Sequence, residues 1–87
     1  MSRITFSEEG WEDYLYWQTQ DKKTLRKINK LLKSIERDGV MEGEGKPEPL
    51  KYRDGEYSRR INETDRLIYA VGESSIIVMS CRGHYEE

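Results

Sequence analysis

The residue type best suited to proton transfer near neutral pH occurs once in this chain, in the closing stretch SCRGHYEE. Histidine has an unperturbed pKa close to neutrality, so His84 could act as an acid or a base. Tyr85 beside it could stack on a nucleic-acid base. Chain ends are usually the least ordered part of a domain, so a working His84 needs a scaffold that holds the tail. A lone terminal histidine is more often simply solvated, and spacing alone leaves both interpretations open.

A carboxylate and several cations could join the imidazole on one surface. Glu48 lies between two prolines, which restrain its backbone and present its side chain rigidly. Adjacent strand residues point to opposite faces of a sheet, so at least one of Arg59 and Arg60 would face solvent. With Arg66 and Lys51, this set suits phosphodiester cleavage, which needs a base, an acid and cations for the pentacoordinate phosphate. Taken one at a time, each is also an ordinary surface or cross-strand residue.

The first 36 residues have the pattern of one strand and two helices. Residues 3–6 alternate and are rich in strand formers, which predicts a short first strand. Ser7 is a suitable N-cap for one helix and Asp21 for a second, with a tight turn near residues 19–21. The buried side of the first helix is expected to hold Trp11, Tyr14 and Leu15. The second helix has an apolar stripe at i, i+3, i+7 and i+10, formed by Leu25, Ile28, Leu32 and Ile35.

The second half of the chain has the pattern of hairpin-connected strands. A loop rich in glycine and proline follows the second helix, and strands are predicted at residues 49–52, 56–62, 66–71 and 75–82. The resulting order is β-α-α-β-β-β-β, an α+β fold in which two antiparallel helices cover one face of a twisted, mostly antiparallel sheet. The last strand is apolar and should lie inside the sheet, so the tail that carries His84 would leave from a buried strand.

The composition fits one small domain spanning residues 1–87. Apolar residues make up 34% and charged residues 37%, which leaves room for one compact core. The net charge is −2, but residues 21–37 hold seven Lys/Arg and two acids, whereas residues 1–20 hold one and four. Cys81 lies in the apolar run IIVMSC and is expected to be a buried, structural thiol. No signal peptide and no apolar run of about 20 residues is visible, which predicts a soluble, cytoplasmic protein without membrane contact.

Several stretches together resemble one bacterial family. They are SEEGWEDYLYWQTQDKKTLRKINKLLKSI, GKPEPLK, SRRI, DRLIYAV and the terminal CRGHY, in this order and over nearly the whole chain. The helical stretch alone would be weak evidence, because amphipathic helices are common. With the four shorter motifs, the sequence resembles the YoeB/Txe-type toxins of bacterial toxin–antitoxin systems, within the RelE/ParE superfamily. The fold of that family agrees with the fold predicted from the residues.

The resemblance implies an endoribonuclease that cleaves mRNA in the ribosomal A site. It implies no metal or other cofactor, because the 2′-hydroxyl of the substrate itself attacks and leaves a 2′,3′-cyclic phosphate. By motif, Glu48 of GKPEPLK would be the general base and Arg66 of DRLIYAV would stabilise the phosphorane. His84 would be the general acid and Tyr85 would orient the flanking base. The phosphate-binding candidates are Lys51, Arg60, Arg59 and, less strongly, Lys46.

The resemblance also implies partners: the ribosome, its mRNA, a YefM/Axe-like antitoxin and a second copy of the toxin. Two features depart from the family pattern. Glu86 and Glu87 follow the tyrosine at which relatives commonly end, and Asp65 stands where a histidine is common. Two rival functions stay open: a gyrase-targeting inhibitor of the ParE type, and a module that binds RNA or the ribosome without cutting.

Overall fold

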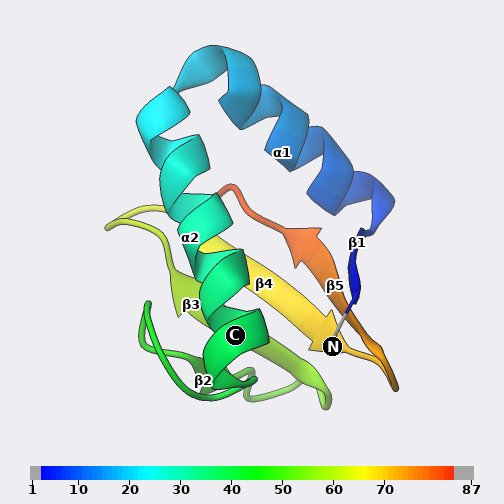
Figure 1. Ribbon diagram of the computed structural model, residues 1–87. Helices are drawn as coiled ribbons and strands as arrows, with labels where there is room; N and C mark the ends of the chain where they lie inside the picture. The colour runs from blue at the N-terminus through cyan, green and yellow to red at the C-terminus, as the bar shows by residue number, and fades with distance from the viewer. Residues whose placement is uncertain (1–2, 84–87) are drawn as a thin grey trace.

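Two helices and five strands make up the part of the chain that the computed structural model describes, residues 3–83 (Figure 1). In chain order they are β1 (Arg3–Phe6), α1 (Glu8–Gln20), α2 (Lys22–Asp38), β2 (Glu48–Pro49), β3 (Glu56–Arg60), β4 (Arg66–Val71) and β5 (Ser75–Ser80). This order confirms the β-α-α-β-β-β-β pattern predicted from the sequence.

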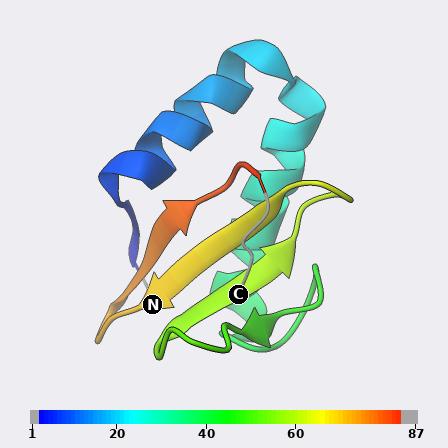
Figure 2. The same ribbon diagram turned by 180° about the vertical axis from the view of Figure 1, so that it is seen from behind.

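The five strands form one sheet in the order β1-β5-β4-β3-β2. β1 pairs with β5 in parallel and the other three pairs are antiparallel. The last strand, β5, therefore lies inside the sheet, as predicted. Both helices lie on the same side of the sheet (Figure 1), and the view from behind shows a face with no helix over it (Figure 2).

Both helices begin at the capping residues expected from the sequence. The Ser7 side chain accepts a hydrogen bond from the Gly10 amide at 3.1 Å. The Asp21 carboxylate accepts from the amides of Lys23 and Thr24 at 3.0 and 3.4 Å. Such caps satisfy amide groups that have no partner within the helix. Asp21 is the only residue between α1 and α2, so the helix connection is as tight as predicted. Neither helix within residues 3–83 is long and apolar enough to cross a membrane.

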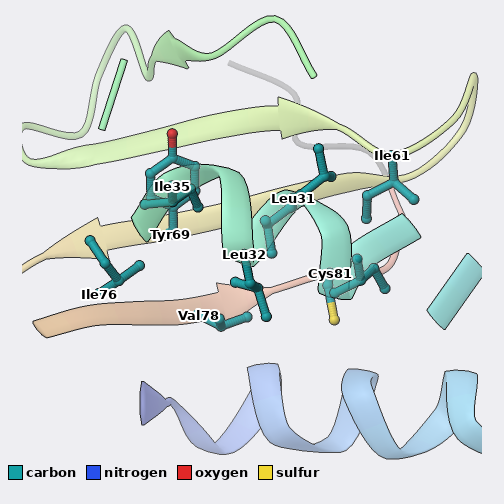
Figure 3. Close-up of a cluster of buried hydrophobic side chains, with 10 residues drawn as sticks. Leu31, Leu32, Ile35, Ile61, Tyr69, Ile76, Val78 and Cys81 are labelled. Atoms are coloured by element: carbon teal, nitrogen blue, oxygen red, sulfur yellow. The ribbon is translucent and has the colours of Figure 1, made fainter. Parts of the chain in front are cut away.

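The core lies between α2 and the helix-covered face of the sheet (Figure 3). α2 contributes three residues of the predicted stripe, Ile28, Leu32 and Ile35. Leu25, the fourth, is half-buried, whereas Leu31, which the prediction did not include, is buried. β4 and β5 contribute apolar side chains from alternate positions, as expected for strands with one buried face. The buried cluster comprises Ile28, Leu31, Leu32, Ile35, Ile61, Leu67, Tyr69, Ile76, Val78 and Cys81.

The buried face of α1 differs from the predicted one. Trp11 is 47% exposed and Leu15 is 42% exposed, so the prediction that both are buried is wrong. The only buried residue of α1 is Gly10, and a Cβ atom at Gly10 would meet the Val78 carbonyl. The helix therefore approaches β5 closely at its first turn. This contact turns Tyr14 and Trp17, four and seven residues further on, toward the core.

Three strands are shorter than predicted. The strand expected at residues 49–52 is reduced to Glu48–Pro49, because residues 51–55 turn back toward β3. β3 ends at Arg60 and β5 at Ser80, two residues before the predicted ends. The later residues leave the ladder because they enter the turn at residues 61–65 and the tail.

Arg59 is completely buried and fastens the loop between α2 and β2. Its guanidinium donates to the carbonyl oxygens of Gly39, Glu42 and Glu44 at 2.8, 2.7 and 2.8 Å. It also donates to the Tyr69 hydroxyl at 3.0 Å, from the side of the core. These acceptors match the forked donors of arginine, which explains how a charged side chain is tolerated there. The prediction that Arg59 could hold a substrate phosphate is therefore corrected: its donors are used inside the protein.

Replacing Arg59 by lysine should lower the free energy of unfolding by about 3 kcal/mol or more. Lysine keeps the buried charge, but it lacks the forked donors that reach several loop carbonyl groups and the tyrosine hydroxyl at once. Urea titration followed by circular dichroism measures the change. Arg60→Lys is the matched control, since Arg60 is exposed, and its unfolding free energy should stay within about 0.5 kcal/mol of the parent's. Equal stabilities for the two variants would contradict the role given to Arg59.

The Cys81 thiol should not react while the protein is folded. Cys81 is completely buried, and burial raises the pKa of its thiol to about 12, with nearby Asp13 and Asp65 acting in the same direction. Ellman's reagent at pH 8 should label it only after guanidinium unfolding. Because the folded pKa exceeds the unfolded one, this thiol's contribution to stability is complete below pH 9 and is lost as the pH rises toward 12. Fast stoichiometric labelling of the folded protein would refute the assignment.

Candidate functional site

The sheet register brings three of the predicted site residues to one face. Glu48 pairs with Ser58, and Arg60 pairs with Arg66. Paired residues share a face, and Ser58 and Arg60 share one because they are two positions apart. Arg59 and its partner Leu67 belong to the helix-covered face, so Glu48, Arg60 and Arg66 lie on the opposite one. From Glu48 to Arg66 the spacing is two strands, roughly 10 Å, across the sheet and two residues, roughly 7 Å, along it.

The charges on this face favour an anionic ligand. Arg60 and Arg66 lie directly opposite each other, an arrangement that is unfavourable for like charges. Arg60 is exposed and Arg66 is half-buried. Neither guanidinium forms an ion pair within residues 3–83. Two arginines held in this way can bind one phosphate group and neutralise charge that develops on it.

Lys46 lies near Arg60, at the end of β3. The Arg60 amide donates to the Gly45 carbonyl at 2.6 Å, which fixes the residue before Lys46 against β3. Lys46 has φ of 51°, a left-handed conformation that is uncommon for residues other than glycine. Together with Lys27 from α2, these residues line a depression of about 320 Å³. Lys51 is exposed in the turn after β2, with its ammonium 5.5 Å from the centre of the Tyr52 ring.

His84 and Tyr85 lie outside the described residues, but the segment that leads to them is held from two sides. On the α1 side, the Asp13 carboxylate accepts from the Cys81 amide at 3.0 Å, and the Trp17 indole donates to the Cys81 carbonyl at 2.9 Å. On the other side, the Arg66 amide donates to the Gly83 carbonyl at 3.0 Å. The tail thus leaves the described part of the chain next to Arg66.

Sequence reasoning missed the residues that hold this tail. Asp13 and Trp17 gave no functional signal, because each looked like one more polar or aromatic residue of an amphipathic helix. Asp65 was noted only as a departure from the family pattern, although its carboxylate accepts from the Gly83 amide at 2.7 Å. A contact between residues 18 positions apart leaves no mark in local spacing, so only the fold could reveal it.

Chemically, the helix-free face of the sheet offers the carboxylate of Glu48 and the guanidinium groups of Arg60 and Arg66, with the start of the tail next to Arg66. Carboxylates can accept a proton and guanidinium groups can stabilise a phosphorane, so the arrangement is suited to phosphodiester chemistry. Within residues 3–83, no group of three or more His, Cys, Asp or Glu side chains is placed to hold a metal ion.

Comparison with known proteins places the chain in a family. Residues 6–85 match the model of the YoeB-like toxin of bacterial type II toxin–antitoxin systems. Toxin YoeB of Escherichia coli K12 is 51% identical over 84 residues, which cover 95% of this chain and 99% of that protein. The structure of the YoeB dimer from Staphylococcus aureus is 54% identical, with a TM-score of 0.91 over 97% of this chain and 98% of that one.

A second solved structure, the heterotetrameric YoeB–YefM toxin–antitoxin complex from Staphylococcus aureus, agrees with these matches. It is 53% identical to this chain, with a TM-score of 0.88 over 98% of this chain and 99% of its own. The similarity therefore covers nearly the whole length of both chains in each comparison. On the family match and these identities, the chain belongs to the YoeB-like toxins of bacterial type II toxin–antitoxin systems.

Proposed function

We propose that this toxin is a ribosome-dependent endoribonuclease that cleaves mRNA in the ribosomal A site and thereby stops translation. The observation that carries the proposal is the pair of arginines, Arg60 and Arg66, that face each other on the open sheet surface with Glu48 in the neighbouring strand. A gyrase-binding or purely RNA-binding surface would not need a carboxylate beside an anion site.

In the proposed reaction, Glu48 accepts the proton of the substrate's 2′-hydroxyl as its oxygen attacks the adjacent phosphorus. The new bond to the 2′-oxygen forms while the bond to the 5′-oxygen breaks, and His84 gives a proton to that leaving oxygen. Arg66 and Arg60 stabilise the charge on the pentacoordinate phosphorus. The products are a 2′,3′-cyclic phosphate and a 5′-hydroxyl, so the chemistry needs no metal ion. Lys46 and Lys51 bind flanking phosphates, and Tyr85 stacks on a base.

The ribosome contributes the alignment that a small, open surface cannot supply. Holding reacting groups in line can lower a barrier by several kcal/mol, roughly 7 or more in well-oriented systems. The A site presents the mRNA, and the basic exposed face of α2 binds ribosomal RNA. The toxin therefore acts in the cytoplasm. It forms a homodimer and is inhibited by a YefM-like antitoxin. The solved YoeB dimer and YoeB–YefM complex from Staphylococcus aureus support these two partners.

Glu48→Gln and His84→Gln should each slow A-site cleavage about 100- to 10,000-fold, because each removes a group that transfers a proton. Primer extension on programmed ribosomes and on free mRNA measures the new 5′ ends. Glu73→Gln is the matched control, since Glu73 is exposed in the turn between β4 and β5, and it should cut like the parent. Ribosome binding should persist in both active-site variants. Translation arrest without new 5′ ends in the parent would refute the nuclease.

Arg60→Gln and Arg66→Gln should lower cleavage about 100- to 1,000-fold each, because each removes a donor to the phosphorane. Neither change should lower the free energy of unfolding through charge loss. Removing one of two facing like charges should instead raise it by up to about 1 kcal/mol. Single-turnover cleavage and urea titration measure the two effects separately. An arginine variant that loses stability and activity in parallel would point to a structural role.

A further inference from the structure

Asp65 forms a hydrogen bond to the tail and has no part in the proposed proton transfers. It is almost fully buried, at 9% exposure, in the turn between β3 and β4. One carboxylate oxygen, Oδ1, accepts from the Gly83 amide at 2.7 Å. The other, Oδ2, accepts from the Asn62 side-chain amide at 3.1 Å and from the Thr64 hydroxyl at 3.2 Å. The carboxylate therefore joins its own turn to the residue that precedes His84.

The turn itself does not need the bond to Gly83. Asn62 Oδ1 accepts from the amides of Thr64 and Asp65, both at 2.8 Å, which closes the turn locally. The Ile61 amide also donates to the Asp65 carbonyl at 3.0 Å. The bond from Asp65 Oδ1 to Gly83 is thus separate from the bonds that shape the turn. It joins the turn to the tail.

Gly83 is the point at which the tail would otherwise have most freedom. Its φ of 88° lies in the region that residues with a side chain rarely adopt, and glycine has the widest choice of backbone conformations. Both of its backbone groups are bound by consecutive residues, the amide by Asp65 and the carbonyl by the amide of Arg66. His84 is the next residue of the chain, so it follows directly on this doubly bound glycine.

We propose that Asp65 is a positioning residue for the general acid: by fixing Gly83 next to Arg66, it orients the start of the tail that carries His84. The inference rests on the proposed nuclease function and concerns the same site. Asp65 does not touch the substrate. It restricts the backbone rotation of Gly83. The segment that carries the general acid therefore begins at a fixed residue next to Arg66, which stabilises the phosphorane. Proton donation to the leaving oxygen depends on that alignment, and attack by the 2′-oxygen does not.

The test compares two substrates on programmed ribosomes under single-turnover conditions. One is an ordinary mRNA, and in the other sulfur replaces the bridging 5′-oxygen at the cut. Thiolate is a good leaving group and needs no proton from an acid. Asp65→Ala should cut the ordinary mRNA about 10- to 100-fold more slowly than the parent, because a group held out of line loses much of its effect. It should cut the sulfur substrate within about threefold of the parent, with the half-saturating ribosome concentration unchanged.

Two further variants separate positioning from folding. Asp65→Asn keeps an oxygen that can accept from Gly83 and should restore most of the rate. Thr64→Ala removes one neighbour of the same carboxylate, leaves the bond to Gly83, and should behave like the parent. Should Asp65→Ala fail to fold, Asp65→Ser serves instead, because its hydroxyl can still bond within the turn but is too short to reach Gly83. Hydrogen exchange of the Gly83 amide should speed up in the alanine or serine variant and stay slow in Thr64→Ala.

The outcomes are distinct. Equal slowing on both substrates would show that Asp65 only supports the fold, and unchanged cleavage of the ordinary mRNA would show that it does nothing for the reaction. Either result would overturn the inference and leave the nuclease standing. A parent protein that cuts neither substrate would overturn the proposed function itself, and this role with it.

Discussion

The buried guanidinium of Arg59 is the interaction on which the rest of this small fold depends. A charge placed in a protein interior is costly unless its donors find acceptors, and here four loop carbonyls and the hydroxyls of Ser34 and Tyr69 supply them. The loop between α2 and β2 has little regular structure, so these bonds decide its path. They bring Gly45 to the edge of β3, where the Arg60 amide binds its carbonyl, and the chain then continues into Glu48.

Two adjacent arginines consequently have opposite tasks. Alternation along β3 turns Arg59 into the core and Arg60 to the face without helices. On that face, Arg60 lies opposite Arg66, a like-charge pairing that is unfavourable for stability but would favour an anion bound between the two guanidinium groups. The strand therefore stabilises the fold with one residue and, in the proposed function, binds phosphate with the next. A one-residue slip in register would abolish both.

The sequence predicted the parts of the structure that have a strong local period. The α2 stripe and the strands β4 and β5 follow from the spacing of apolar residues, and both caps follow from residue type. α1 was misjudged because two of its contacts with β5 and the tail are made by Gly10 and Asp13, which no apolar pattern includes. Alternation likewise predicted that one of Arg59 and Arg60 points inward, but not which, because that depends on carbonyl groups of an irregular loop. The catalytic roles of Glu48 and His84 came from the resemblance and remain predictions.

The same physical device recurs wherever the fold must hold a segment that has no helix or strand of its own. A domain of this size buries too little apolar surface to order long irregular stretches by packing alone. Residues 39–46 are held by Arg59, and residues 81–83 are held by Asp13, Trp17 and Asp65. These two segments lead directly into Glu48 and His84, the proposed base and acid. The side chains that hold these two segments therefore fix where the chain enters the proposed base and where it enters the proposed acid. The sheet between the two segments carries Arg60 and Arg66, which the phosphate would meet.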